Sequence, residues 1–304
     1  MRQKRWLVNV PVATVWTMPD RIRLIDEEAI SATCNIDKWI SHLNQTHLLD
    51  LCKENRIQTQ VLYGDEVIII DETNNWVSVI VPSQSTSKHK EGYPGWIPLS
   101  QLVEANEHNV ACDKRAVMIN DNANLIFENG EKRQVSFATV LPIISEKEHD
   151  VLIATPTSRG WISKTDIKIF SSTSKIKPTS GDSVLLDAEK FLKLPYFWGG
   201  TSSFGYDCSG FTYSMCRANG FDIPRDAVDQ AKSGSEVSLD QLKRGDLLFF
   251  AYEKGKGKIH HVGFYYGEGR MIHAPKTGKC IEVIQLLGSE YEYELCIARR
   301  YTYQ

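Results

Sequence analysis

The chain has 304 residues, which at roughly 150 residues per domain predicts about two domains, with three small ones as the alternative. Hydrophobic residues make up 42% and charged residues 24%, a globular composition that excludes disorder of the chain as a whole. The 35 Lys and Arg residues against 38 Asp and Glu residues give a net charge of −3. This balance argues against a general nucleic-acid-binding protein, which carries a clear positive excess.

The first residues, Met1–Thr17, do not have the pattern of a targeting segment. Basic residues come first, but the apolar run that follows is broken by Asn9, Pro11 and Thr14. No stretch approaches the roughly 20 apolar residues that a membrane span needs. We therefore expect a cytoplasmic protein without a membrane partner.

The cysteines indicate free thiols rather than a disulfide framework. There are seven, widely scattered and odd in number, and none stands in a CxxC or other metal-binding spacing. We therefore expect no zinc site and no cofactor. Most of these thiols should be small buried hydrophobes, so the question is whether one of them is reactive.

One linker and one internal repeat organise the chain. The linker, Ser171–Asp182, is rich in Ser, Thr, Lys, Pro and Gly. Before it, Gly95-Trp96-Ile97 and Gly160-Trp161-Ile162 are each followed, after three residues, by a polar and an apolar residue. Each copy follows strand-like runs, at 66–70 and 76–81 in the first and at 135–144 and 151–154 in the second. We predict two small β-barrels, with a helical insertion at 20–54 in the first.

The part after the linker mixes helix and strand. Apolar residues at 185, 188, 191 and 192 recur at helical spacing, and a second helix is predicted to begin near Cys208 and to end at Gly220. Strands are then expected at 246–250, 261–266, 270–273, 280–284 and 294–299. Helices followed by an antiparallel sheet are typical of an α+β domain.

The second of these helices begins at a candidate nucleophile. Asp207 is a plausible N-cap, which places Cys208 in the first helical turn. Helix N-termini favour anions and lower the pKa of a thiol, although the Asp207 carboxylate opposes this effect. A neighbouring imidazolium would favour the thiolate more strongly.

Two histidines on adjacent strands supply a candidate base and its partner. His261 opens one strand, His273 lies on the next, and Gly267-Glu268-Gly269 is a turn that makes the strands a hairpin. Gly263 leaves room on the same face as His261, whereas the competing base His260 should point to the opposite face. A nucleophile, a base and a third polar group that orients the base form the usual activated arrangement.

These motifs resemble a known family. Tyr196-Phe197-Trp198-Gly199-Gly200, Asp207-Cys208-Ser209-Gly210, Gly245–Phe250, His261–Tyr265 and Ile272-His273-Ala274 are similar, in this order, to the NlpC-type papain-like cysteine peptidases of bacterial cell-wall metabolism. The resemblance implies Cys208 as nucleophile, His261 as base and His273 as the orienting residue. It also implies that Tyr196 lies beside the nucleophile and helps to stabilise the oxyanion.

The complete order of domains resembles the YkfC-type γ-D-glutamyl-L-diamino acid endopeptidases. This implies two SH3-like barrels, at 1–106 and 107–172, before a papain-like catalytic domain at 173–304. It further implies that the first barrel caps the active-site cleft and that Tyr93 and Asp226 recognise a free L-Ala amine. A second acid, Asp65 or Glu66, is expected from the barrel, and Trp198, Asp207 and Ser209 are expected to line the substrate. Ala227 departs from the Ser that is common there.

The resemblance implies hydrolysis of the γ-D-Glu–diamino acid bond in murein tripeptides or tetrapeptides, L-Ala-γ-D-Glu-diamino acid, without a metal. We expect a monomer, although the sequence does not give the oligomeric state. Two alternatives stay open. One is a peptidoglycan amidase or acyltransferase of the same fold, and the other is a wall-binding module without activity. The sequence does not distinguish meso-diaminopimelate from L-Lys as the diamino acid.

Overall fold

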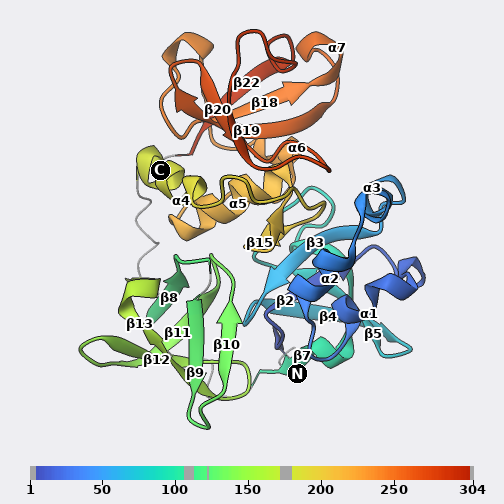
Figure 1. Ribbon diagram of the computed structural model, residues 1–304, viewed down its shortest axis with the longest axis vertical. Helices are drawn as coiled ribbons and strands as arrows, with labels where there is room; N and C mark the ends of the chain where they lie inside the picture. Colours follow the sequence, from blue (N-terminus) through green and yellow to red (C-terminus); the bar gives the residue numbers. More distant parts are fainter. Residues whose placement is uncertain (1–4, 106–112, 122, 172–179, 302–304) are drawn as a thin grey trace. The chain divides into compact units, whose positions relative to one another are not determined.

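The computed structural model describes residues 5–105, 113–121, 123–171 and 180–301. The chain divides into two compact units (Figure 1). One is Met1–Ile176 with Ser202–Phe204, and the other is Lys177–Thr201 with Gly205–Gln304. The predicted domain boundaries at 106/107 and 172/173, most of the predicted linker, and Cys112 lie outside the described residues.

The first unit contains two seven-stranded antiparallel sheets with the same strand order: adding seven to each strand number of the first sheet gives the order of the second. The first is ordered β3-β2-β6-β5-β4-β1-β7 and the second β10-β9-β13-β12-β11-β8-β14. The strands of the first sheet are β1 (Trp6–Val8), β2 (Val12–Trp16), β3 (Ile57–Leu62), β4 (Glu66–Thr73), β5 (Trp76–Val81), β6 (Tyr93–Pro98) and β7 (Leu102–Glu104). Those of the second are β8 (Lys114–Met118), β9 (Ala123–Phe127), β10 (Lys132–Val135), β11 (Val140–Glu146), β12 (Asp150–Ala154), β13 (Arg159–Ser163) and β14 (Ile167–Ser171).

The repeated Gly-Trp-Ile lies at equivalent places in the two sheets. It belongs to β6 in one copy and β13 in the other, and each strand leads through a short 3-10 helix, Leu99–Gln101 or Lys164–Asp166, into the last strand. In both copies one long strand changes partner. The start of β4 pairs with β1 and its remainder with β5, while β11 pairs first with β8 and then with β12. Both carry a register shift, after Ile69 and Ile143, and such bulges bend a strand so that a sheet folds over its own core.

The expected single run at 135–144 is wrong in one respect. β10 ends at Val135 and β11 begins at Val140, because a turn separates them in which Ala138 adopts a positive φ of 64°. Every residue from Ser136 to Thr139 is buried, so the apolar pattern continued through the turn. Burial without a glycine or proline signal concealed the break.

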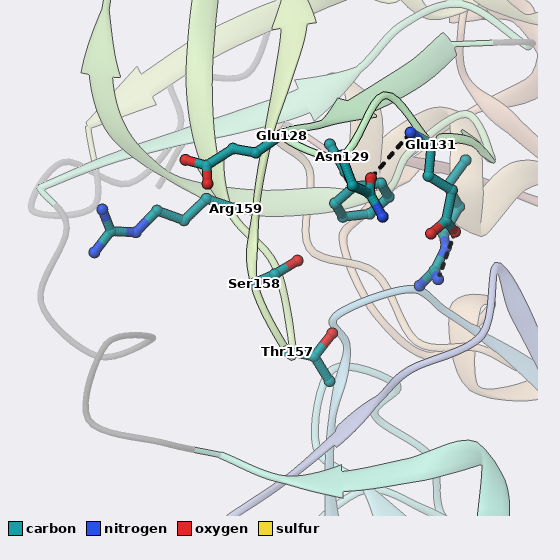
Figure 2. Close-up of a pocket in the computed structure, with 8 residues that line it drawn as sticks. Glu128, Asn129, Glu131, Thr157, Ser158 and Arg159 are labelled. Atoms are coloured by element: carbon teal, nitrogen blue, oxygen red, sulfur yellow. Dashed lines mark hydrogen bonds and ion pairs between the residues drawn. The ribbon is translucent and has the colours of Figure 1, made fainter.

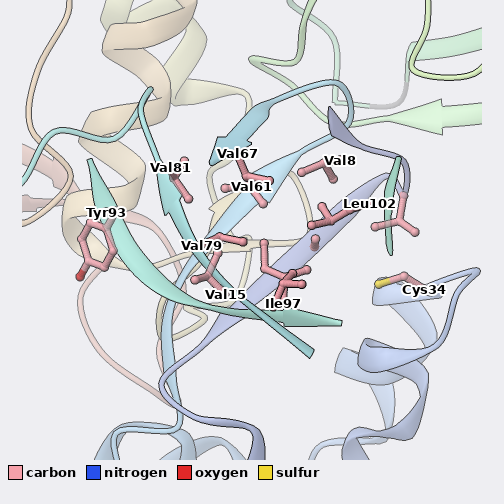
Figure 3. Close-up of a cluster of buried hydrophobic side chains, with 13 residues drawn as sticks. Val8, Val15, Cys34, Val61, Val67, Val79, Val81, Tyr93, Ile97 and Leu102 are labelled. Atoms are coloured by element: carbon pink, nitrogen blue, oxygen red, sulfur yellow. The ribbon is translucent and has the colours of Figure 1, made fainter. Parts of the chain in front are cut away.

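Helices at the expected insertion pack on the first sheet. They are α1 (Glu27–Ile30), α2 (Ile36–His42) and α3 (Gln45–Lys53), and Asn35 and Asn44 cap the last two by accepting hydrogen bonds from Lys38 N and His47 N. Trp39 of α2 is fully buried, 5.8 Å from the ring of Trp16 in β2. Cys34, before α2, reaches the valine-rich core of the first sheet (Figure 3), so the insertion completes that core.

The second unit is an antiparallel sheet covered by helices, as expected for an α+β domain. Its sheet order is β17-β22-β18-β19-β20-β21. The strands are β17 (Ser235–Val237), β18 (Leu247–Ala251), β19 (Ile259–Gly267), β20 (Arg270–His273), β21 (Glu282–Gln285) and β22 (Leu295–Arg300), with the two-residue strands β15 (Thr201–Ser202) and β16 (Gly205–Tyr206) before them. The helices are α4 (Gly181–Glu189), α5 (Cys208–Ala218), α6 (Ala227–Gln230) and α7 (Tyr252–Gly255).

An aromatic chain joins the helices of the second unit to its sheet. Phe191 contacts Tyr206, Tyr206 contacts Phe211 of α5, and Phe211 contacts Phe264 of β19, with ring centroids 5.1, 5.7 and 6.1 Å apart. Such aromatic pairs add to the free energy of burial. This core fixes the start of α5 against β19. No helix among the described residues combines the length and apolar character needed to cross a membrane.

Candidate active site

Cys208 is the first residue of α5, and its position is set by the cap before it. Asp207 has an extended backbone, and its carboxylate accepts a hydrogen bond from Gly210 N at 2.6 Å. A second bond, from Gly199 N at 3.0 Å, ties the preceding loop to the same carboxylate. A Cβ on Gly210 would lie 2.0 Å from the carbonyl oxygen of Gly200, so only glycine lets the loop pack this closely. Loop and helix therefore hold Cys208 between them.

Arg225 stabilises this N-cap by hydrogen bonds to Asp207 and Ser209. Its guanidinium donates to both carboxylate oxygens of Asp207, at 3.1 and 2.7 Å, and to the hydroxyl of Ser209 at 2.9 Å. Arg225 is 1% exposed. The predicted substrate-lining residues Asp207 and Ser209 thus have their side-chain oxygens held within the protein. No sequence motif marks Arg225, although it directly precedes the predicted acid Asp226.

Gln230 attaches the Arg225 segment to α5. Its side chain accepts from Thr212 Oγ1 and donates to the carbonyls of Ser209 and Pro224. Asp226 is the N-cap residue that precedes α6, and it is half-buried. Asp226, the acid predicted to bind an amine, is therefore next in the chain to Arg225, which holds the first turn of α5.

The structure brings His261 and His273 together. Nε2 of His261 lies 2.8 Å from Nδ1 of His273, and the two rings meet edge to face with centroids 5.0 Å apart. Gly263 makes room for this, since a Cβ there would lie 2.9 Å from the His273 Cβ. His260 is engaged elsewhere: its ring stacks on Tyr252 and its Nε2 lies 3.1 Å from Glu294 Oε2.

Tyr291 forms a wall of the histidine pair that sequence reasoning missed. Its ring stacks on His261 with centroids 4.9 Å apart and meets the edge of His273 at 5.1 Å. Burial raises the pKa of the Tyr291 hydroxyl, and Glu290 and then Cys208 add to this effect. Tyr291 lies in the loop between β21 and β22, where no motif or periodicity marks it.

The Cys208 thiol lies beside the strand that carries His261. Backbone groups of Ser209 and of Val262, the residue after His261, contact the Cys208 thiol. Because Nε2 of His261 is occupied by His273, Nδ1 is the nitrogen left to accept a proton. Thiol, imidazole and a second imidazole form the set of groups that nucleophilic catalysis needs.

Burial sets the protonation states of this site. It raises the pKa of Cys208 to about 12, with the Asp207 carboxylate as the next cause. It lowers the pKa of His261 well below 6.5, and that of His273 to about 4. The expected lowering of the thiol pKa by the helix N-terminus is therefore wrong, because the loss of solvent outweighs it. Both shifts favour a neutral thiol and a neutral imidazole at rest.

Tyr196 and Trp198 lie on the loop that the Asp207 cap holds. Tyr196 is buried, and its backbone N–H donates to the carbonyl of Lys279 at 2.9 Å. The Trp198 indole is half-buried, and its Nε1 is a buried donor without a hydrogen-bond partner among the described residues. An unsatisfied buried donor is suited to a ligand acceptor.

The predicted site residues of the first unit are part of its framework. Tyr93 is 1% exposed and belongs to the core cluster of the first sheet, where Figure 3 shows its hydroxyl directed away from the valines. That hydroxyl contacts the ammonium of Lys88. Asp65 closes a turn by accepting from Leu62 N at 2.9 Å, and Glu66 forms an ion pair with Arg5.

A surface pocket lies in the second sheet and includes none of these residues. Figure 2 shows its polar rim, and its lining consists of Phe127, Glu128, Asn129, Glu131, Arg133, Thr157, Ser158 and Arg159. It contains no nucleophile beside a base. Within the described part of the chain, no three His, Cys, Asp or Glu side chains are grouped so that they could hold a metal ion.

The remaining described thiols lack such an environment. Cys34 and Cys216 are buried, and burial raises the pKa of each. Cys34 donates to the carbonyl oxygens of Val12 and Ala29. Cys52 and Cys296 are half-buried and Cys280 is exposed, so the expectation that most of the thiols are buried is wrong for the described residues.

Comparison with known proteins gives matches along most of the chain. Residues 193–300 match the NlpC/P60 family, 119–170 the YKFC SH3b2 domain, and 52–102 the bacterial dipeptidyl-peptidase SH3 domain. The chain is 47% identical over 291 residues to the γ-D-glutamyl-L-lysine dipeptidyl-peptidase of Bacillus subtilis strain 168, which covers 95% of this chain and 96% of that protein. It is 35% identical to the protein of the same name from Bacillus cereus, over 99% of this chain and 92% of that one.

One solved structure is similar to this chain over nearly its full length. The crystal structure of an NlpC/P60 family protein from Bacillus cereus ATCC 10987 matches with a TM-score of 0.94 at 36% identity. The match covers 98% of this chain and all of that one, 100%.

Proposed function

Because this chain belongs to the NlpC/P60 family of cysteine peptidases, with two SH3-type domains before the catalytic one, we propose that it hydrolyses the γ-D-Glu–diamino acid bond of free murein stem peptides. The peptides carry an unblocked N-terminal L-Ala, and the product is L-Ala-D-Glu. The names of the two Bacillus relatives support the bond and the dipeptide product. The 2.8 Å contact between His261 and His273, next to a thiol at a helix start, supports the chemistry.

The proposed reaction starts from the neutral pair. As Sγ of Cys208 attacks the carbonyl carbon of the γ-amide, its proton moves to Nδ1 of His261, and the new imidazolium donates through Nε2 to His273. The backbone N–H of Cys208 and the hydroxyl of Tyr196 are the proposed donors to the oxyanion.

Breakdown of the tetrahedral intermediate follows. His261 gives its proton to the leaving amine of the diamino acid, the C–N bond breaks, and a thioester remains on Cys208. Water, deprotonated by His261, then attacks this thioester. Proton return to sulfur restores the enzyme and releases L-Ala-D-Glu.

The substrate-binding roles rest on charge and on the resemblance. A free α-amine is cationic at neutral pH, so the Asp226 carboxylate is proposed to bind it. Tyr93, and Asp65 as the second acid, are assigned to the same recognition by the resemblance alone. Trp198 offers an unpaired indole donor, while Asp207 and Ser209 line the substrate with their side-chain oxygens held by Arg225.

We also propose the domain boundaries of the chain, its oligomeric state and the compartment in which it acts. We divide the chain at 106/107 and 172/173, which fits the ends of the two seven-stranded sheets. A requirement for a free amine fits peptides already cut from the wall, so we place the reaction in the recycling of imported peptides in the cytoplasm, with a monomer as the active form. Cell fractionation and gel filtration test these two points.

The activity is tested with purified full-length protein and a panel of peptides, read by mass spectrometry of the products. We expect L-Ala-γ-D-Glu-L-Lys or its diaminopimelate counterpart to release L-Ala-D-Glu, and Cys208→Ala to abolish cleavage. Cys280→Ala, which changes an exposed thiol of the same unit, is the matched control and should keep full activity. Undiminished turnover by Cys208→Ala would contradict the cysteine-peptidase mechanism.

Blocking the amine tests the substrate assignment. Acetylation of L-Ala, or its extension to an intact muropeptide, should prevent hydrolysis, and Asp226→Asn should raise KM for the free peptide. Equal rates on free and acetylated peptides would remove the roles given to Asp226 and Tyr93. Amide cleavage only at the sugar–peptide linkage would favour the amidase alternative.

A further inference from the structure

The outer nitrogen of His273 has no hydrogen-bond partner. His273 is fully buried, and while its Nδ1 contacts His261, its Nε2 is a buried polar atom left unsatisfied among the described residues. The carboxyl group of Glu282 lies close to this nitrogen, with Oε1 3.8 Å from Nε2. His273 and Glu282 face each other as register partners of β20 and β21.

We propose that Glu282 is a positioning residue of the catalytic site, whose carboxylate accepts a hydrogen bond from Nε2–H of His273 and so fixes the tautomer of the histidine pair. This inference rests on the proposed function, because it concerns the same nucleophile and base. Glu282 acts through His273 and touches neither Cys208 nor substrate.

Proton counting shows why the tautomer matters. Neutral His261 accepts the thiol proton on Nδ1 only if its own proton is on Nε2, which then donates to an unprotonated Nδ1 of His273. A neutral His273 with a bare Nδ1 carries its proton on Nε2, the atom that faces Glu282. In the other tautomer His273 donates through Nδ1, which forces the His261 proton onto Nδ1 and blocks it as a base.

Glu282 has the freedom that this role requires. β21 is the edge strand of the sheet, and the Glu282 side chain is 49% exposed, so a small torsional change brings its carboxylate into hydrogen-bond range. The other titratable groups near His261 and His273 are His260 of β19, Lys276, Tyr291 and Cys208. Lys276 forms an ion pair with Glu290 and not with Glu282. The carboxyl group of Glu282 lies instead near His273.

Burial keeps His273 neutral even with this acid nearby. Its pKa is lowered to about 4, so the carboxylate meets a neutral N–H donor at physiological pH. Glu282 therefore selects between two neutral tautomers and does not create a second imidazolium.

The test compares Glu282→Ala and Glu282→Gln in the full chain, with Glu268→Gln as the control. Glu268 is an exposed acid in the turn between β19 and β20, paired with Arg270. We expect Glu282→Ala to lower kcat about tenfold with little change in KM, since ground-state binding of the peptide does not involve Glu282. Glu282→Gln keeps an acceptor oxygen and should retain most of the activity, and Glu268→Gln should behave as wild type.

The second readout needs no substrate. Two-bond ¹H–¹⁵N spectra of labelled protein should show His273 protonated on Nε2 in the wild type and in Glu282→Gln, and a mixture or the Nδ1–H form in Glu282→Ala. An unchanged tautomer together with unchanged kcat in Glu282→Ala would overturn the inference. If the wild type cleaves no stem peptide, the proposed function fails, while the tautomer measurement still decides the role of Glu282.

Discussion

Arg225 and Asp207 form a two-point ion pair at the first turn of α5, the helix that begins with Cys208. The shorter contact is 2.7 Å, and the two side chains are only 1% and 11% exposed. The same Asp207 carboxylate caps α5 and holds the Gly199 N–H. The position of Cys208, the proposed nucleophile, therefore depends on a charge pair that does not include it.

Arg225→Lys should destabilise the protein and slow the reaction. A lysine cannot make the two parallel bonds, and an imperfectly paired buried carboxylate costs about 3 kcal/mol, the lower end for breaking a buried pair. Urea unfolding and peptide hydrolysis measure the two effects. Arg270→Lys, which changes an exposed pair with Glu268 at 2.8 Å, should cost less than about 1 kcal/mol. Equal effects of both substitutions would show that the buried pair is not special.

Stability should decrease as pH falls from 6.5 towards 4. The folded-state pKa of His273 is lowered to about 4 from an ordinary value of 6.5, so in this window the unfolded chain binds a proton that the folded chain does not. The contribution is complete above pH 6.5 and amounts to about 3 kcal/mol. Urea unfolding at several pH values gives the free energy of unfolding as a function of pH. Its slope should be smaller in His273→Asn than in the wild type, and the slope that remains is assigned to His261. His149→Asn, at an exposed site, should leave the slope unchanged.

Gly263→Ala should impair catalysis through the position of His273. The new Cβ would lie 2.9 Å from the His273 Cβ and 2.7 Å from the Met271 sulfur, so both side chains must move. We expect kcat to fall at least about tenfold and stability to fall by about 1–3 kcal/mol. Gly160→Ala is the control, because its Cβ would meet atoms only at 3.6 Å. A Gly263→Ala variant with normal kcat would show that the histidine pair tolerates displacement.

Tyr291→Leu should move the acid limb of the activity profile to higher pH. Activity requires neutral His261, whose pKa burial holds well below 6.5, so the rate should fall only when the pH drops through that low value. Removing the stacked ring admits water and raises the pKa of His261 towards 6.5. Profiles of kcat/KM between pH 4 and 8 measure the shift. Tyr291→Phe keeps the ring and should retain the wild-type limb; a shifted limb in this variant as well would assign the effect to the hydroxyl.

Local signals in the sequence account for most of the predicted elements. The predicted helix from Cys208 to Gly220 is α5, because an Asp N-cap and a glycine just beyond the end are short-range determinants. The Gly-Trp-Ile repeat marks equivalent strands because each copy combines a turn with an apolar face. The prediction of one unbroken strand at 135–144 was wrong because the turn at Ser136–Thr139 is buried, and its residues carry no glycine or proline that would mark a turn.

The sequence by itself indicated the two repeated sheets and the family, and it predicted the candidate catalytic residues, since these depend on order and spacing along the chain. Only the tertiary structure decided the partners: Arg225 under Asp207, Tyr291 on His261 and Glu282 opposite His273. It also decided the direction of the thiol pKa, which burial raises against the helix N-terminus. Contacts between distant residues and the loss of solvent are consequences of packing, and no local pattern records them.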